Sequence, residues 1–398
     1  MKILISLFLL SATLGTSALA TAVASETRLL PAGGSDQVAT RVVSRPAPAT
    51  PSEHAPVQFS WALDPTEALR QPEPFVVESR EYWQTVDGVQ LERGVDISTS
   101  APGAVIRVSP ARAGAGAAVD VDALRVTRGG RAVALRRRTD GAQLRAAGMP
   151  VTERAGAVQL GDAAPAGRYQ VQMPRARGQY VIHVYEPRSD VRLFAALGRD
   201  RLLAGGTGDI VVNLSDGDRR LQGLQAGGLL VAPSGESWPI RLRPGKDGML
   251  RGKVAVPPDA GSQPGLWEVQ VFAGNGNVQR DARTALAIAQ PTARLGGDYA
   301  FDATRLQFAL PVQVGSPGRY EARGTLYATA PGGALRPVSI AHSADWLAPG
   351  KARLLLRFDR AHLPAGYTAP FELRDLELND QSRMAPIERR ARAARVSR

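Results

Sequence analysis

The sequence contains no cysteine and few aromatic residues. Its 398 residues include no Cys, and Phe, Trp and Tyr together make up 6%. Without cysteine the chain can form no disulfide, no thiolate nucleophile, no Cys-ligated metal site and no acylated lipoprotein anchor. Each domain must therefore be stabilised by its core alone, and that core has to be built mainly from Val, Leu, Ile and Ala.

The sequence also lacks an apolar run of the roughly 20 residues that a bilayer crossing requires. Its apolar N-terminal stretch, Ile3–Leu10, follows the positive charge of Lys2. Two A-x-A sequences come next and end at Ala20 and Ala24, a pattern typical of signal-peptide cleavage sites. We therefore predict that residues 1–24 are a signal peptide. The mature protein is then periplasmic or secreted, with no transmembrane segment after processing.

Lysine is scarce, yet the formal net charge is +12 because arginine is abundant. An excess of arginine and alanine is typical of a GC-rich genome. The candidate polyanion-binding residues are Arg136, Arg137 and Arg138, and a second basic cluster forms a tail from Arg389 to Arg398. Neither cluster has interleaved aromatic residues for stacking on bases, so no specific nucleic-acid partner is indicated. A solvated strand face is the favoured interpretation, and a polyanion site is the alternative.

A short phrase recurs about once per 100 residues. It consists of a glycine, an aromatic residue and alternating polar and apolar residues, and it surrounds Tyr169, Trp267 and, in a looser form, Tyr367. Alternation places the aromatic residue and the following apolar residues on one face of a strand. The spacing matches the length of an immunoglobulin-like domain. We therefore expect Trp267 in the core of a sandwich.

Each of the first two phrases is followed by a turn and another strand-like run. The turns are Pro174–Gly178 and Gly274–Asn277, and each pair of runs predicts a closing hairpin. The 41 Gly and 29 Pro agree with a chain rich in turns. We predict an all-β fold of consecutive immunoglobulin-like sandwich domains. The first is larger and carries short helices near Asp64–Leu69 and Ala142–Ala147, where capping residues precede apolar ones.

These signals divide the chain into five parts. Residues 1–24 are the signal peptide, and 25–55 form a flexible Pro-rich segment. An N-terminal β-rich domain covers 56–188, an immunoglobulin-like domain 189–290, and a C-terminal immunoglobulin-like domain 291–398. The last domain ends in the basic tail.

The chain resembles a family of uncharacterised exported proteins from gammaproteobacteria with tandem immunoglobulin-like domains and a domain-of-unknown-function label. The stretches that carry the resemblance are Tyr82–Val86, Ala101–Val108 and Phe371–Met384. The hairpin Leu266–Ile288 also looks like the closing hairpin of bacterial immunoglobulin-like modules. The resemblance implies a sandwich fold and a protein of unknown activity, so it implies no catalytic or binding residue.

Motifs that carry chemistry are missing. The sequence has no G-x-S-x-G, no H-E-x-x-H and no phosphate-binding loop. Pairs of oxygen-bearing residues that could contribute to a calcium site are Asp120 with Asp122, Asp216 with Asp218, and Asn379 with Asp380. Calcium needs about six oxygens or more, so we interpret these pairs as turn or surface residues. No catalytic residue, metal or cofactor is predicted.

The favoured function is a non-enzymatic exported protein that presents immunoglobulin-like domains to a protein or envelope glycan partner, since loops on rigid scaffolds are frequent binding sites. The alternative is a hydrolase, or an accessory subunit, that acts on envelope or host polymers through the first domain. A cleft lined by His183, Asp120 or Glu186 would favour that alternative.

Overall fold

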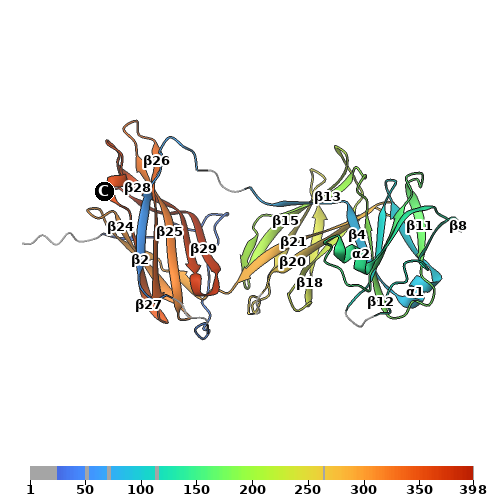
Figure 1. The fold of residues 1–398 in the computed structure, drawn as a ribbon. Coiled ribbons are helices and arrows are strands. Elements are labelled where there is room, and N and C mark those ends of the chain that lie inside the picture. Colours follow the sequence, from blue (N-terminus) through green and yellow to red (C-terminus); the bar gives the residue numbers. More distant parts are fainter. Residues whose placement is uncertain (1–24, 50–52, 70–72, 113–115, 263–264, 398) are drawn as a thin grey trace, which may run out of the picture.

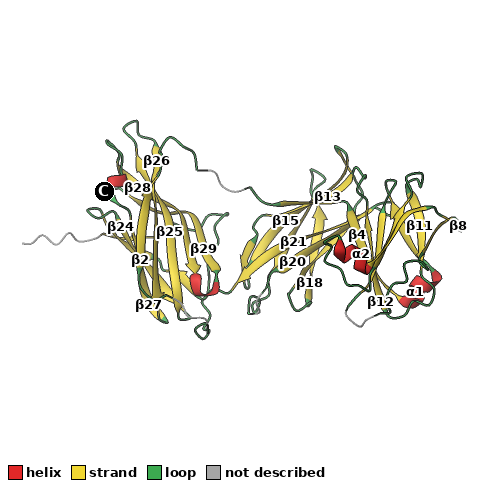
Figure 2. Ribbon diagram, viewed as in Figure 1, coloured by secondary structure: helices red, strands yellow, loops and turns green. Residues whose placement is uncertain are grey.

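The computed structural model describes residues 25–49, 53–69, 73–112, 116–262 and 265–397. In these parts of the chain the strands form five sheets around three hydrophobic cores (Figure 1). The helical segments are short, as Figure 2 shows: α1 (Gly88–Arg93), α2 (Gly141–Ala146), η1 (Arg360–His362) and η2 (Gln381–Arg383). None of the helices in the described part has the length and apolar character that a membrane crossing needs. The predicted fold class, an all-β chain of consecutive immunoglobulin-like sandwiches, is confirmed.

The N-terminal domain is a sandwich of two sheets. Its larger sheet contains, in spatial order, β4 (Glu81–Asp87), β12 (Gln179–Tyr185), β6 (Val105–Pro110), β10 (Gly156–Leu160) and β9 (Leu135–Asp140). Its smaller sheet contains β5 (Val95–Thr99), β11 (Gly167–Gln172), β7 (Arg125–Arg128) and β8 (Arg131–Ala132). Alternate residues of both sheets meet in one core, where Ile106 and Tyr180 are fully buried.

The closing hairpin predicted for this domain is wrong. The strands β11 and β12 do not pair with each other: β11 pairs with β5 and β7, and β12 pairs with β4 and β6. Tyr169 thus enters the core from one sheet and Tyr180 from the other. A crossing between sheets lets both strands bury their apolar faces against each other, and sequence alternation alone does not distinguish it from a hairpin.

Of the two short helices predicted, one is present. Asp140 and Gln143 form a reciprocal capping box at the start of α2. The helix predicted at Asp64–Leu69 is a turn instead. The Asp64 carboxylate accepts hydrogen bonds from the backbone and the hydroxyl of Thr66, and Leu69 is exposed. A single helical turn with no apolar face to bury is not stable by itself.

The middle domain has a ten-stranded sheet around its core, nine strands in one continuous order and one beside it. The order is β14 (Arg201–Leu203), β21 (Gln279–Ala289), β20 (Trp267–Gly274), β17 (Gln225–Val231), β18 (Ser237–Pro244), β19 (Leu250–Ala255), β15 (Thr207–Asp216), β13 (Val191–Leu197) and β3 (Val76–Ser79), with β16 (Arg219–Arg220) beside β15. The predicted hairpin of β20 and β21 is confirmed. Trp267 is 5% exposed and lies against Trp238, with ring centroids 5.3 Å apart, so its predicted core position is also confirmed.

The C-terminal sandwich contains two five-stranded sheets. One contains β1 (Ser25–Arg28), β23 (Asp298–Asp302), β24 (Gln307–Val314), β22 (Ala293–Leu295) and β27 (Gly350–Arg357). The other contains β2 (Val57–Ala62), β26 (Leu335–Leu347), β25 (Gly318–Thr329), β28 (Thr368–Asp380) and β29 (Ala385–Val396). Its core includes Tyr320 and Phe308, both fully buried.

The N-terminal segment does not behave as the predicted flexible tether. Its strand β1 pairs with β23, Leu29 enters the C-terminal core, and β2 pairs with β26. Figure 1 shows β2, in blue, beside the orange and red strands of this sandwich. Residues 56–62 therefore belong to the last sandwich rather than to the N-terminal domain. The predicted domain boundaries at residues 188 and 290 remain predictions.

The predicted basic tail is a strand. Residues 385–396 form β29, which pairs with β28 along its length. Arg392 lies 2.6 Å from the carboxylate of Glu372, and the fully buried Ala393 and Ala394 face the core. Burial along this strand does not follow a strict period of two, because a β-bulge places Ala393 and Ala394 side by side in the core.

Candidate ligand-binding cleft between the first two domains

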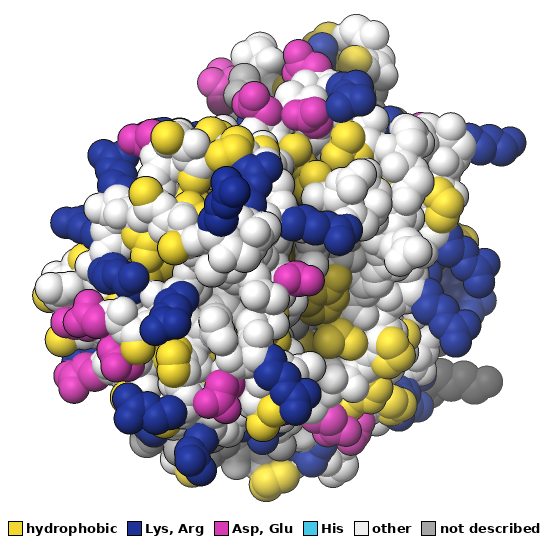
Figure 3. All heavy atoms as spheres, turned by 90° about the vertical axis from the view of Figure 1, so that its right-hand side faces the viewer, with side chains coloured by type: hydrophobic (Ala, Val, Ile, Leu, Met, Phe, Trp, Pro, Cys, Tyr) yellow, Lys and Arg dark blue, Asp and Glu magenta, His cyan; other side chains and the backbone are white. Residues whose placement is uncertain are grey.

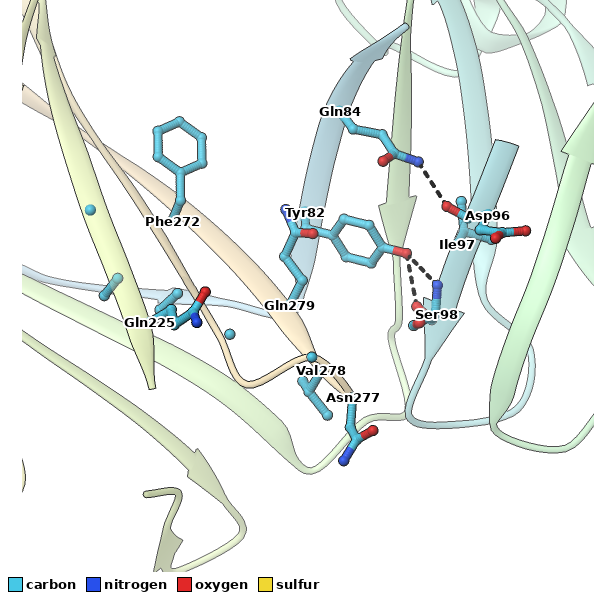
Figure 4. A pocket seen from close by; sticks show the side chains of 15 residues that line it. Tyr82, Gln84, Asp96, Ile97, Ser98, Gln225, Phe272, Asn277, Val278 and Gln279 are labelled. Carbon is cyan, nitrogen blue, oxygen red and sulfur yellow. Dashed lines mark hydrogen bonds between the residues drawn. The ribbon is translucent and has the colours of Figure 1, made fainter. Parts of the chain in front are cut away.

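A cleft of about 470 Å³ lies where the N-terminal and middle domains meet. The N-terminal domain contributes residues of β4 and β5, and the middle domain contributes residues of β17 and of the β20–β21 hairpin. Figure 4 shows Tyr82, Gln84 and Asp96 on one side and Phe272 and Gln225 on the other. The volume is within the range of roughly 300–1,000 Å³ that small-ligand sites occupy, and domain junctions are common places for such sites.

The N-terminal wall of the cleft is fixed by side chains of β4 that hydrogen-bond to the backbone of β5. The Tyr82 hydroxyl donates to the Ser98 carbonyl at 2.8 Å and accepts from the Ser98 N–H at 2.9 Å. The Gln84 amide donates to the Asp96 carbonyl at 3.2 Å. Tyr82 is only 3% exposed, and burial raises the pKa of its hydroxyl above the ordinary value. The wall is therefore rigid, and its tyrosine stays neutral.

Beside the cleft a buried ion pair joins the two domains. Arg280 of β21 and Glu186, which follows β12, lie 3.0 Å apart, and both side chains are 1% exposed. The guanidinium also donates to the Val191 carbonyl and to the hydroxyls of Ser100 and Ser189. The second oxygen of Glu186 accepts from the N–H and the hydroxyl of Ser100. Nearly every polar atom of the pair thus has a partner, as buried charges require.

The neighbouring Asp281 connects the hairpin to the N-terminal domain in a second way. Its carboxylate accepts from the Trp83 N–H of β4 at 2.8 Å. Its carbonyl accepts from the Ser79 hydroxyl of β3, within the middle domain, at 2.5 Å. Burial is the main reason that the pKa of Asp281 is raised to about 6. Trp83 also meets Phe272 edge to face at 5.7 Å. The two walls of the cleft are therefore held in one fixed relation.

The three arginines predicted as a polyanion site do not share a face. Arg136 lies at a β-bulge of β9 and pairs with Asp162 at 3.2 Å. Arg137 and Arg138 point to opposite faces of the sheet, and Arg138 donates to the Leu124 carbonyl at 2.9 Å. On the face of the molecule in Figure 3, basic side chains are scattered with acidic ones between them. This arrangement fits a solvated surface better than a concentrated anion site.

None of the three residues expected to support a hydrolase lines the cleft, and each is engaged in contacts of its own. His183 is 2.8 Å from Glu81 on β4, and this hydrogen bond is the main cause of the lowered pKa of Glu81. Asp120 accepts from backbone N–H groups of its own turn, and Glu186 is buried against Arg280. In the part of the chain that the structure describes, no three His, Asp or Glu side chains are grouped to hold a metal ion.

A second hollow of about 460 Å³ lies between residues 36–41 and residues 199–207 of the middle domain. Its two guanidinium groups already bond to backbone carbonyls: Arg41 to Pro258 at 2.8 Å and Arg199 to Asp36 at 3.0 Å. These bonds join the N-terminal segment to the middle domain. We therefore interpret the second hollow as a seam between segments and the first cleft as the candidate site.

Sequence patterns did not identify the residues of the cleft or of the junction. The one available signal was Arg280-Asp281, two consecutive charged residues inside an otherwise alternating strand. Both are buried, with Ala282 beside them, which breaks the alternation of a half-buried strand. The polar lining residues Gln225 and Asn277 carry no comparable signal, because amides are common in turns and at strand ends.

The fold and the cleft define a multidomain all-β protein with a junction site. The sequence matches the N-terminal domain of a domain of unknown function, DUF4785, over residues 48–186, and its C-terminal domain over residues 292–397. The chain therefore belongs to the DUF4785 family. The family is described as a domain of unknown function, so the match assigns no activity.

The chain is also similar in fold to a solved structure. A crystal structure of a DUF4785 family protein from Legionella pneumophila superposes with a TM-score of 0.64 at 18% identity, and the match covers 90% of this chain and 98% of that one. A four-domain ectodomain fragment of ICAM-5 matches at a TM-score of 0.22 and 11% identity, covering 86% of this chain and 99% of that one. No curated protein gives a significant match. The first of these likenesses supports the fold.

Proposed function

We propose that this protein is a non-enzymatic binding protein whose ligand, a piece of a cell-envelope partner, occupies the cleft between the first two domains. The observation that carries the proposal is the buried Arg280–Glu186 pair beside the cleft, where Arg280 directly follows the lining residue Gln279 on β21. The ion pair fixes two walls that come from different domains. A site that is formed before the ligand arrives binds more tightly, because no binding free energy is lost in ordering it.

The chemistry of the cleft supports binding rather than catalysis. General acid–base catalysis needs a positioned proton donor and a positioned acceptor. The lining includes one carboxylate, Asp96, and no His, Cys or Lys. Its one phenol, Tyr82, is engaged with Ser98. The hydrolase alternative has no corresponding support, since His183, Asp120 and Glu186 do not line the cleft.

Filling the cleft at Gly227 is expected to abolish ligand binding without unfolding the protein. Gly227 lies directly opposite Phe272 on the neighbouring strand, and a side-chain carbon added there meets no atom within 4 Å. Gly227→Phe therefore places a ring in open space inside the cleft. The measurement is native mass spectrometry and thermal shift of the mature protein with an enzymatic digest of envelope polymers.

A matched control is Gly332→Phe, a substitution at another glycine with open space around it, in the C-terminal sandwich. We expect this control and the unmodified protein to bind the same fragment and Gly227→Phe not to bind it. The melting temperature of Gly227→Phe should stay within a few degrees of that of the unmodified protein. Equal binding by all three proteins would show that the cleft is not the site.

We also infer that the protein is exported, as its gammaproteobacterial resemblance implies. The support is the predicted signal in residues 1–24, which lie outside the described residues. N-terminal sequencing of native protein is expected to start just after Ala20 or Ala24, and recovery of Met1 contradicts export by this route.

A further inference from the structure

The cleft is poor in charge although the protein is rich in it. The chain has 49 Lys and Arg, yet no lysine or arginine lines the cleft, and its one charged lining residue is Asp96. A site for phosphate, sulfate or carboxylate groups is normally built with arginine or lysine. In this cleft an anionic ligand would meet a carboxylate and no counter-charge. Polyanions are therefore poor ligands for it.

Extended peptides are also disfavoured, because the strand edge in the wall is already satisfied. A peptide that adds to a sheet needs free backbone N–H and C=O groups along an edge strand. At β5 side chains from β4 occupy three of these groups: Tyr82 bonds to both backbone groups of Ser98, and Gln84 bonds to the carbonyl of Asp96. Recognition in this cleft has to go through side chains.

The side chains that remain available are amides, a carboxylate and a ring. Gln225, Asn277 and Asp96 are among the residues that line the cleft, and their side chains hydrogen-bond to no other described residue. Each amide offers a donor and an acceptor, and the carboxylate offers two acceptors. Phe272 is half-buried and contributes an apolar surface beside them. Figure 4 shows that the amides and the carboxylate come from opposite walls.

We propose that the ligand of this cleft is an uncharged oligosaccharide. Vicinal hydroxyls both donate and accept hydrogen bonds, as Gln225, Asn277 and Asp96 do, and the apolar C–H face of a sugar ring packs on Phe272. The proposal rests on the proposed function, since it names the class of ligand for the same cleft. The saccharide proposal also goes beyond the proposed function, because a binding protein as such does not specify whether its ligand is a sugar, a peptide or an anion.

The test measures binding of the mature full-length protein to four kinds of probe by calorimetry. The probes are neutral trisaccharides of glucose, galactose and N-acetylglucosamine, a sulfated heparin tetrasaccharide, trilysine, and an uncharged extended tetrapeptide. We expect a neutral trisaccharide to bind with an affinity that is unchanged between 50 and 500 mM NaCl. Binding that depends on released counterions falls steeply over such a range.

Two substitutions locate the binding. Gln225→Ala removes one neutral hydrogen-bonding group and is expected to weaken the trisaccharide roughly two- to tenfold. Asp96→Asn keeps the shape and removes the charge, and is expected to weaken it about tenfold. Gln222→Ala is the matched control, because Gln222 is an exposed glutamine close in sequence that does not line the cleft. It is expected to leave the affinity unchanged.

Every other result overturns the saccharide proposal. If trilysine binds, and both Asp96→Asn and high salt abolish this binding, the ligand is cationic. If the tetrapeptide or the heparin fragment binds at this cleft, the ligand is a peptide or a polyanion. In each of these cases the proposed function survives if Gly227→Phe blocks the probe. If no probe and no envelope fragment distinguishes Gly227→Phe from the unmodified protein, both proposals fail.

Discussion

Replacing Arg280 by methionine is expected to destabilise the junction of the first two domains by about 3–5 kcal/mol, the usual consequence of removing one partner of a buried ion pair. The substitution leaves the Glu186 carboxylate, 1% exposed, without its counter-charge. It also removes the donor that the hydroxyls of Ser100 and Ser189 accept from. The measurement is urea unfolding followed by tryptophan fluorescence.

The matched control is Arg251→Met in the same domain. Arg251 pairs with Asp247 at 2.7 Å, but the two side chains are 48% and 46% exposed. Exposed pairs contribute about 0–1 kcal/mol, so this variant is expected to unfold almost like the unmodified protein. A second variant, Arg280→Met with Glu186→Gln, removes both charges and should recover part of the loss. If Arg280→Met and Arg251→Met unfold alike, the junction does not depend on the ion pair.

Strand alternation in the sequence predicted which residues of a strand face the core. A period of two assigns each residue to one face, so the buried positions of Tyr169 and Trp267 followed from the repeated phrase. Alternation does not say which strand a given strand pairs with. The prediction of a hairpin for β11 and β12 failed for this reason, and so did the placing of β2 in the first domain.

The cleft was beyond sequence reasoning for a related cause. Arg280 and Glu186 are 94 residues apart, and their pairing depends on how two domains dock. A buried arginine and an exposed one look the same in a single sequence, because the type of residue does not reveal its partners. Motif searches detect chemistry only when its residues keep a local spacing, and the residues of this cleft come from four separate segments.

Deleting residues 25–62 is expected to unfold the C-terminal sandwich, although that sandwich lies mostly beyond residue 290. The deletion removes β1 and β2 from the edges of its two sheets. It also removes the buried Leu29 and Ala39 from its core. Burial of one such large apolar side chain contributes about 1.5–3 kcal/mol, and a domain has only about 5–15 kcal/mol in total.

Polar contacts add to this loss. Arg319 donates to the carbonyls of Glu53 and Ala55 at 2.8 Å each. Glu388, whose pKa burial raises to about 7, accepts from the Ala39 N–H at 3.1 Å. Deletion leaves both of these buried groups with fewer partners, and a buried polar group without a partner costs about 1–3 kcal/mol. The two losses together exceed what a marginally stable sandwich can tolerate.

Calorimetry of the mature protein measures the effect. We expect the deletion to remove the thermal transition of the C-terminal sandwich, while the transition of the joined N-terminal and middle domains persists. Replacing the exposed Thr66–Leu69 with glycine and serine is the control, and it should leave all transitions in place. A peptide of residues 25–62 added in trans should restore the lost transition, because it supplies the missing strands. A deleted protein that melts like the complete chain would show that β1 and β2 are dispensable covers rather than parts of the sandwich.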